Sequence, residues 1–202
     1  MGAPVEDRRE ELLEAGIDLL AERPFSRITM NDIAERSGVT KPMVYYYFES
    51  KEGFYRELAR FVIRSIREET RKSLRTDCSL RETFVHYAEY RLQYARKKPV
   101  FTKAILRLFT DENVGEYIAD LLEEFEQFLE IWNPLFERAR ERGEIRPDVT
   151  TWLVVEIFNA VLTHFVVHEV MKDSLPGEYV PGHREIVDLL FRGIESDRRS
   201  PR

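Results

Sequence analysis

The sequence predicts an all-α protein in which short helices give way to long ones near residue 50. Apolar residues recur at spacings of three and four along the chain, and no run alternates between apolar and polar residues as a half-buried strand would. The 9 glycines and 9 prolines gather between the apolar segments rather than inside them. Helical periodicity bounded by these helix breakers is typical of an all-α fold.

The composition describes a globular chain of one or two domains. Its 202 residues are 43% hydrophobic and 34% charged, and the formal net charge is −6. Such an acidic chain can bind nucleic acid only through a local basic patch, because non-specific binders are usually basic. The single cysteine, Cys78, excludes an intramolecular disulfide and a cysteine-rich zinc site. The charged N-terminus lacks the apolar segment of a signal peptide, so we expect a cytoplasmic protein.

The most apolar stretch runs from Trp152 to Met171. A membrane span takes about 20 predominantly apolar residues, and charge at the membrane centre costs several kcal/mol. This stretch contains Glu156, Asn159 and two histidines. We therefore expect a helix that packs against protein, and no membrane association.

Helix start and stop signals predict the N-terminal elements. Thr29 and Asp32 fit a capping box, and Gly38 fits a helix end that needs positive φ. Thr40 is the expected cap of the next helix, with Pro42 in its first turn, where a missing N–H does no harm. The predicted helices are 5–22, 30–37, 41–47 and 51–74.

The same signals predict longer helices in the rest of the chain. Ser79 and Glu82 form a second capping box, Pro99 begins another helix, and Gly143 ends a long one. The predicted helices are 80–97, 99–109, 113–142, 149–172 and 186–195.

Residues 29–47 are arranged as a helix, a short turn with glycine, and a second helix. This is the helix-turn-helix arrangement, in which the second helix enters the major groove of DNA. From Arg23 to Lys51 there are five basic residues against three acidic ones, so the segment is locally positive in an acidic chain. Short helices joined at a glycine also occur in many all-α proteins. Three consecutive tyrosines favour a polyanion-binding surface, because a core does not need tyrosine on every side of a helix.

Residues 29–52, TMNDIAERSGVTKPMVYYYFESKE, resemble the signature of the TetR family of transcriptional regulators, and the resemblance covers residues 6–66. It implies a three-helix DNA-binding domain over 6–66 and a larger helical ligand-binding and dimerisation domain over 67–202. It also implies DNA contacts, mostly to phosphates, from Thr29, Thr40, Lys41, Tyr45, Tyr46, Tyr47 and Lys51. Pro42 and Met43 would lie nearest the base edges.

Two positions depart from the family pattern. Tyr47 stands where the family often has histidine, and Pro42-Met43 replaces a frequent Gly-Thr-like pair. Both differences bear on the operator sequence, and Met43 offers an apolar contact to a thymine methyl.

Aromatic residues concentrate between Phe84 and Phe136. They can build the core, or some can line a cavity for a flat or lipophilic ligand. The ligand-binding candidates are Tyr87, Tyr90, Tyr94, Phe109, Phe125, Phe128 and Trp132. The family resemblance implies an inducer pocket in this domain. It also implies a four-helix dimer interface made by residues 152–171 and 186–194 of each subunit.

We therefore expect a homodimeric repressor that a small lipophilic or aromatic ligand releases from its operator. Its expected partners are double-stranded operator DNA, the inducer and a second copy of the chain. The alternative is a helical metal-dependent enzyme that uses His164 and His168, which lie at i, i+4. A third ligand is not evident, although Glu156 and Glu169 are candidates. No phosphate loop or nucleophile motif accompanies the histidines, so we expect no catalytic residue, metal or cofactor.

Overall fold

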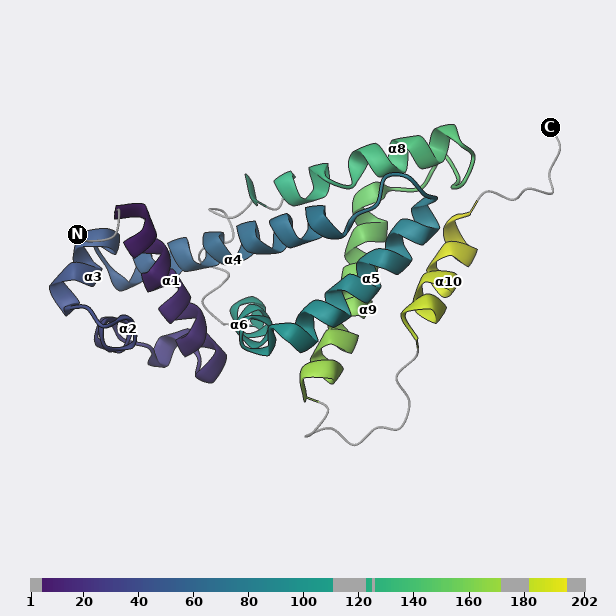
Figure 1. Ribbon diagram of the computed structural model, residues 1–202. Helices are drawn as coiled ribbons and strands as arrows, with labels where there is room; N and C mark the ends of the chain where they lie inside the picture. Colours follow the sequence, from purple (N-terminus) through teal and green to yellow (C-terminus); the bar gives the residue numbers. More distant parts are fainter. Residues whose placement is uncertain (1–4, 111–122, 125, 172–181, 196–202) are drawn as a thin grey trace. The chain divides into compact units, whose positions relative to one another are not determined.

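A computed structural model describes residues 5–110, 123–124, 126–171 and 182–195 of the chain, and every regular element within them is helical. The elements are α1 (Val5–Glu22), η1 (Phe25–Arg27), α2 (Met30–Ser37), α3 (Lys41–Phe48), α4 (Lys51–Ser73), α5 (Leu80–Lys97), α6 (Pro99–Thr110), α8 (Asn133–Glu141), α9 (Thr151–Met171) and α10 (His183–Ile194) (Figure 1). These bounds agree with the prediction of an all-α fold.

The chain divides into two compact units. The first comprises residues 1–66 and 98–124, and the second comprises 67–97 and 125–202, as far as these are described. The continuous helix α4 contributes to both units, and α6 belongs to the first although it follows α5 in sequence.

The first unit is built on α1, which packs against both α2 and α6. Leu12, Leu20 and Ile33 are fully buried in its core. Gly16 of α1 leaves room for the ring of Phe54 on α4, because a Cβ there would lie 2.7 Å from Cζ of Phe54. A side chain at this position would therefore push the two helices apart.

The predicted capping box begins α2. The backbone N–H of Asp32 donates to Oγ1 of Thr29 (3.2 Å), and the backbone N–H of Thr29 donates to Oδ2 of Asp32 (2.7 Å). Gly38 ends the helix with φ at 68°, in the left-handed region that glycine adopts without strain. The local sequence signals thus set both ends of α2.

Thr40 is the N-cap residue of α3, as predicted, but its side chain does not cap the helix. Its hydroxyl makes no capping hydrogen bond, and the Thr40 carbonyl instead accepts from the N–H of Met43 (2.9 Å). Pro42 in the first turn has no N–H for a capping oxygen to accept from. The helix is anchored by the buried side chains of Val44 and Phe48.

The second unit has an aromatic core centred on Phe84. Its ring contacts those of Trp132 (5.1 Å between centroids) and Phe158 (4.7 Å), and all three side chains are buried. Arg81 of α5 pairs with Asp188 of α10 at 2.6 Å. Both α9 and α10 pack against α5, which is therefore the central helix of this unit.

The predicted continuous helix 113–142 is interrupted. Its start lies outside the described residues, residues 126–130 are helical, and a turn at Ile131-Trp132 precedes α8. Pro134 explains the break, because its ring removes a backbone donor and clashes with the carbonyl one turn earlier.

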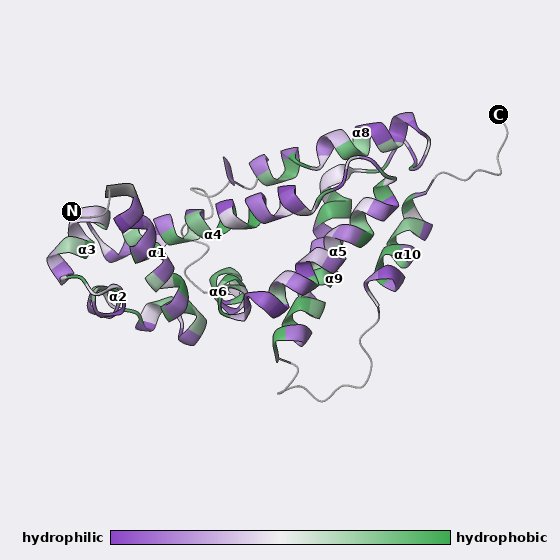
Figure 2. Ribbon diagram, viewed as in Figure 1, coloured by the Kyte–Doolittle hydropathy of each residue, from purple (hydrophilic) through white to green (hydrophobic). Residues whose placement is uncertain are grey.

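Helix α9 is apolar along most of its length, as its colouring in Figure 2 shows. Residues Thr151–Val170 are long and apolar enough to span a membrane by length and composition, and 33% of this window is buried inside the protein. One helix of this kind is weak evidence for a membrane span. Its inner face packs on α5, which leaves an apolar outer face open.

Candidate nucleic-acid interface

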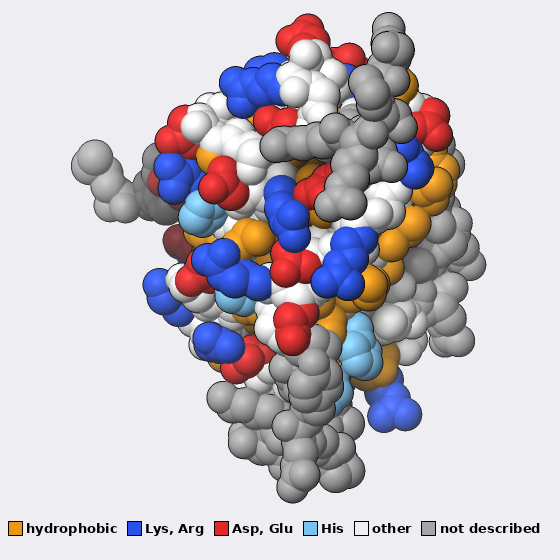
Figure 3. All heavy atoms as spheres, turned by 90° about the vertical axis from the view of Figure 1, so that its right-hand side faces the viewer, with side chains coloured by type: hydrophobic (Ala, Val, Ile, Leu, Met, Phe, Trp, Pro, Cys, Tyr) orange, Lys and Arg blue, Asp and Glu red, His pale blue; other side chains and the backbone are white. Residues whose placement is uncertain are grey.

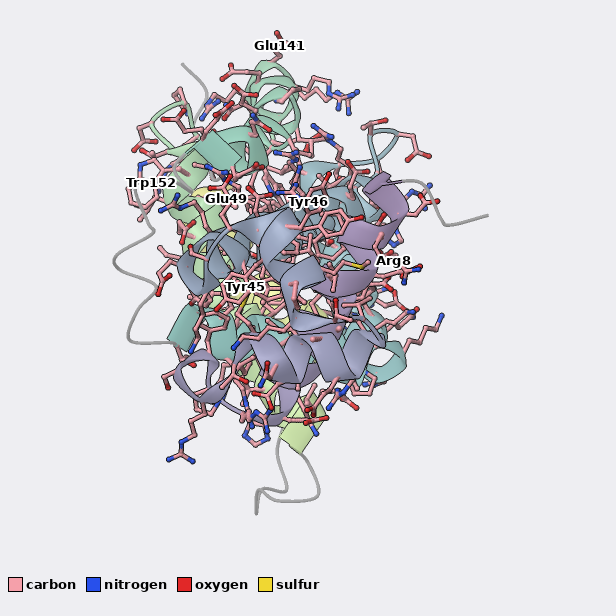
Figure 4. All side chains as sticks on the ribbon, turned by 90° about the vertical axis from the view of Figure 1, so that its left-hand side faces the viewer. Arg8, Tyr45, Tyr46, Glu49, Glu141 and Trp152 are labelled. Carbon is pink, nitrogen blue, oxygen red and sulfur yellow. The ribbon has the colours of Figure 1, made fainter. Side chains whose placement is uncertain are left out.

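Helix α3 presents an outward face of unusual composition (Figure 4). Tyr46 is 78% exposed, Met43 42% and Tyr45 40%, whereas Val44 and Phe48 are buried. Figure 4 labels Tyr45 and Tyr46 on this side of the first unit. Large aromatic and apolar side chains normally lie inside a protein, so their exposure on an anchored helix indicates a contact surface.

The first turn of α3 combines one cation with a free hydroxyl group. Lys41 and Thr40 are both exposed, and the Lys41 ammonium lies 5.9 Å from the ring centroid of Tyr45. Because the Thr40 hydroxyl does not cap the helix, it remains able to donate to a phosphate oxygen.

Thr29 has a different environment from Thr40. Its hydroxyl donates to Oδ2 of Asp32 (2.8 Å), and Arg23 pairs with the same carboxylate at 2.8 Å. The hydrogen bonds from Thr29, followed by the nearby Arg23 charge, lower the pKa of Asp32 below its ordinary value. The Thr29 side chain therefore caps the start of α2, and its predicted contact with a DNA phosphate stays a prediction.

Lys51 connects α4 to η1. Its Nζ donates to the carbonyl of Ser26 (3.2 Å) and lies 5.0 Å from the ring centroid of Phe25. An ammonium carries three donors, so two remain for a phosphate after the Ser26 bond is made.

The three tyrosines of α3 are not equivalent. Tyr46 is the most exposed of them, and its ring meets that of Tyr47 edge-on at 5.3 Å. Tyr47 is half-buried and lies 6.4 Å from Phe48, so part of its ring extends the core. Tyr45 and Tyr46 are thus the more accessible pair.

Two residues beside this face were not predicted from the sequence. Glu49 follows α3 with φ at 61°, and among the described residues it is the non-glycine residue with positive φ. Arg9 of α1 lies 5.2 Å from the ring centroid of Phe48 and pairs with Glu57 at 3.2 Å. The Arg9 contacts join distant parts of the sequence, so no local spacing signals them. No spacing signals the positive φ of Glu49 either.

Among the candidate ligand-binding residues, Tyr87 lies in the interior of the second unit. Its hydroxyl donates to Oδ1 of Asn159 (2.7 Å) and accepts from Nη1 of Arg91 (2.8 Å). Its ring meets that of Trp132 edge-on at 4.9 Å. Polar groups are therefore embedded directly beside the aromatic core.

Tyr90 and Tyr94 form a stacked pair on α5, with ring centroids 6.4 Å apart. The Tyr90 hydroxyl donates to the carboxylate of Glu69 on α4. Burial, then the hydrogen bond to Glu69, raises the pKa of Tyr90 to about 12. Burial also raises the pKa of Tyr94. Both side chains are neutral hydrogen-bonding groups at physiological pH.

The other ligand-binding candidates do not all lie together. Trp132 is fully buried, and its Nε1 has no hydrogen-bond partner among the described residues. Phe128 is half-buried against the same core, whereas Phe109 is 45% exposed on α6 of the first unit. Phe125 lies outside the described residues.

Helix α9 exposes an apolar stripe, here called the α9 stripe, on its outer face. Its members are Trp152, Leu153, Ile157 and Val161, between 40% and 55% exposed. Leu189 of α10 is also 73% exposed. Figure 3 shows hydrophobic side chains open to solvent between charged groups on this side of the second unit.

The two histidines of the alternative enzyme hypothesis also lie on α9. The ring centroids of His164 and His168 are 5.2 Å apart. Within the described part of the chain, no group of three or more His, Cys, Asp and Glu side chains is placed to hold a metal ion.

Residues 12–58 match the family model of bacterial regulatory proteins of the tetR family. This segment includes all of α2 and α3. The family match thus falls on the helices that carry the exposed face described above.

Named regulators are similar to longer parts of the chain. The HTH-type transcriptional repressor KstR2 of Rhodococcus jostii is 27% identical over 146 residues, which cover 70% of each chain. The HTH-type transcriptional activator FasR of Mycolicibacterium smegmatis is 32% identical over 79 residues, which cover 39% of this chain and only 36% of that protein.

Solved structures show the same fold at lower identity. FadR from Bacillus subtilis, in complex with stearoyl-CoA, has a TM-score of 0.71 at 16% identity and covers 91% of this chain and 95% of its own. The fatty acid degradation regulator FadR from Bacillus halodurans has a TM-score of 0.71 at 17% identity, covering 100% of both chains. The architecture of a helix-turn-helix head followed by a helical domain is thus shared.

Proposed function

Because the chain belongs to the TetR family of transcriptional regulators, we propose that it is a homodimeric repressor released from operator DNA by a small lipophilic or aromatic ligand. Members of this family are regulators and not enzymes, which removes the metal-dependent enzyme as an alternative. The observation that carries the proposal is the outward face of α3, where Met43, Tyr45 and Tyr46 are exposed on a helix anchored by buried residues. We place the protein in the cytoplasm, where operator DNA is accessible.

We propose that a second copy of the chain packs against the α9 stripe. Four large apolar side chains on one helix face favour burial against protein, and Leu189 of α10 extends the apolar surface. A symmetric dimer would present two copies of α3 to successive major grooves, about 34–36 Å apart. Pairing through α9 and α10 would therefore explain both the exposed stripe and the capacity to bind a two-fold operator.

The interior of the second unit supports a ligand with an apolar body and a polar end. Trp132 and Tyr87 supply aromatic surface, while Arg91 and Asn159 supply hydrogen-bonding groups beside them. FadR from Bacillus subtilis holds stearoyl-CoA on the same fold, and that ligand combines these two characters. For this chain we propose a lipophilic or aromatic ligand that engages the candidate residues in the second unit.

Release of DNA is proposed to follow from a shift between two states of the dimer. A ligand that binds one state better than the other shifts the population toward it. Helix α4, about 35 Å long at 1.5 Å per residue, runs from the DNA-binding unit into the ligand-binding unit. This mechanism would be contradicted if scattering or fluorescence found the same distance between the two DNA-binding units of the dimer with and without inducer.

DNA binding is tested first, by fluorescence anisotropy with DNA from upstream of the protein's own gene and with selected random DNA. We expect tight binding that weakens as salt is raised, because phosphate contacts release counterions. Lys51→Ala should lower the affinity and reduce the salt slope by about one. Lys72→Ala, at an exposed lysine of the same helix, is the matched control and should leave binding unchanged.

A transcription assay tests the sign of regulation. With the selected operator placed between promoter and reporter, a repressor lowers transcription and the inducer restores it. Increased transcription in the presence of the protein would instead make the chain an activator, as FasR is named.

A further inference from the structure

We propose that His164 and His168 of α9 together bind a divalent transition metal ion that prefers imidazole ligands, with zinc as the first candidate. Water completes the coordination, and the ion takes part in no reaction. The inference goes beyond the proposed function and is independent of it, because one chain supplies both protein ligands.

The two imidazoles lie one helical turn apart on the same side of α9, with ring centroids 5.2 Å apart and ring planes at 63°. Histidine is the commonest protein ligand of metal ions. Two imidazoles that bind one tetrahedral zinc ion through Zn–N bonds of about 2.0–2.1 Å have ring centroids about 5 Å apart. The observed separation therefore fits a shared ion, and binding needs little movement of either ring.

Both side chains are accessible and have no competing polar partner. His164 is exposed and His168 is half-buried. Within the described part of the chain, the two rings contact each other, His164 meets Phe165 edge-on at 5.6 Å, and no hydrogen bond or ion pair holds either histidine. A histidine that served the core would have its ring nitrogens hydrogen-bonded. A neutral imidazole has one nitrogen with a free lone pair, so each ring offers a donor atom to a metal ion.

The charges around the pair suit a cation. His168 lies in the last turn of α9, and the C-terminal end of a helix favours positive charge. The adjacent Glu169 binds Arg96 through two contacts of 2.9 Å, from Nε to Oε1 and from Nη2 to Oε2. The charge of Arg96 is thereby balanced, and the Glu169 carboxylate is committed to it rather than to the ion.

The number of protein ligands determines which metals the pair can hold. Among the described residues, no group of three or more His, Cys, Asp and Glu side chains is placed to bind a metal ion. Zinc is usually four-coordinate, so two imidazoles leave two positions to water. Imidazole suits copper and zinc, whereas magnesium prefers oxygen ligands. The pair should therefore bind copper more tightly than zinc and should not bind magnesium.

Calorimetric titration of the full chain, freed of any affinity tag, with copper, zinc and magnesium tests the proposal. His164→Ala and His168→Ala should each lower the zinc affinity at least about tenfold, because loss of an outer-shell partner alone costs roughly 10–100-fold. His86→Ala is the control and should leave the affinity unchanged. It removes a histidine of α5 whose Nε2 lies 3.4 Å from Nη1 of Arg75.

Moving one histidine along the helix tests the geometry itself. Ala160 is exposed one turn before His164, so Ala160→His combined with His168→Ala restores two histidines at i, i+4. This double variant should recover the affinity that His168→Ala loses. Glu156→His combined with His168→Ala restores the number of histidines but places them two turns apart, about 12 Å at 1.5 Å per residue. It should bind zinc no better than His168→Ala does.

Two results would overturn the proposal. Equal zinc affinity in the wild type, His164→Ala and His168→Ala would place any bound zinc elsewhere. Recovery of affinity by the Glu156→His double variant, to the same extent as by the Ala160→His double variant, would reduce the effect to the number of histidines. Circular dichroism that shows the same helix content in every variant excludes unfolding as the cause of a loss. Failure of operator binding would overturn the proposed function and leave the metal site intact.

Discussion

At the start of α2, the carboxylate of Asp32 bonds with both the backbone and the hydroxyl of Thr29 and pairs with Arg23. These contacts hold the first turn of the helix on which α3 packs. The arrangement makes Thr29 a positioning residue, whereas Thr40 offers an uncommitted hydroxyl at the start of α3. Thr29 and Thr40 both stand directly before a helix in the sequence, but only the Thr29 side chain takes part in a capping box.

We predict that Asp32→Ala lowers the free energy of unfolding by about 1 kcal/mol at pH 7, the usual value for loss of a helix cap. The pKa of Asp32 is lowered in the folded state, so its contribution is present above its unfolded pKa, about 3.9. The contribution is lost as the pH falls through the lower folded pKa. Denaturant unfolding of the wild type and of Asp32→Ala, measured from pH 7 to pH 3, should show that their difference in free energy of unfolding becomes smaller as the pH falls. Thr29→Ser, which keeps the hydroxyl, is the control, and a difference independent of pH would contradict the cap.

At the scale of elements, the approach of α1 to α4 depends on one residue. A Cβ at Gly16 would lie 2.7 Å from Phe54, whose ring is fixed by contact with Phe48 at 4.8 Å. The close packing of these helices therefore requires the absence of a side chain. This packing keeps Phe54, near the N-terminus of α4, in contact with Phe48, which anchors α3.

We predict that Gly16→Ala destabilises the protein by about 1 kcal/mol, since the overpacking cost exceeds the gain in helix propensity. Gly193→Ala is the matched control, because nothing lies within 4 Å of a Cβ at that position of α10. It should raise stability by about 0.5 kcal/mol. Thermal unfolding of the two variants gives the comparison. An increase in stability in both variants would show that the Phe54 ring moves at little cost to accommodate a side chain at position 16.

The helix bounds were predictable because their signals are local. The capping box at Thr29, the glycine at 38 and the serine at 79 each act within one helical turn, and the structure has helix ends at all three. Pro134 was also visible, but the continuing apolar periodicity favoured an unbroken helix, and the proline proved decisive. Local preference and periodicity compete at such positions, and only the packed fold decides between them.

The site was predictable in part. The exposed face of α3 follows from the helix-turn-helix pattern, since burying Val44 and Phe48 leaves Met43 and Tyr46 outside. The bond from Lys51 to the Ser26 carbonyl and that from Tyr87 to Asn159 could not be predicted. They join residues far apart in the sequence, and no spacing rule specifies which distant helices pack together.

At the scale of the whole molecule, the proposed function depends on pairing of two subunits through the α9 stripe, which is itself a proposal. We predict that Ile157→Glu, which places a charge in the proposed interface, converts the dimer to monomers in sedimentation experiments. The operator affinity should fall at least tenfold, because two heads would no longer bind as one unit. Arg64→Glu introduces a carboxylate at an exposed position of α4 and should leave the dimer intact. A variant at Ile157 that remains dimeric would place the interface elsewhere.

Helix α6 packs on α1, although it lies beyond α5 in the sequence. The head is therefore not one contiguous piece of polypeptide, and residues 1–66 alone would leave the α1 surface uncovered. This restricts how regulators of this kind can be recombined. A chimaera that joins this head to a foreign sensory domain must carry α6 with the head, or receive a helix whose apolar face fits α1. A foreign sensory domain can thus replace the native one only if α6, or another helix that covers the same surface of α1, stays with the head.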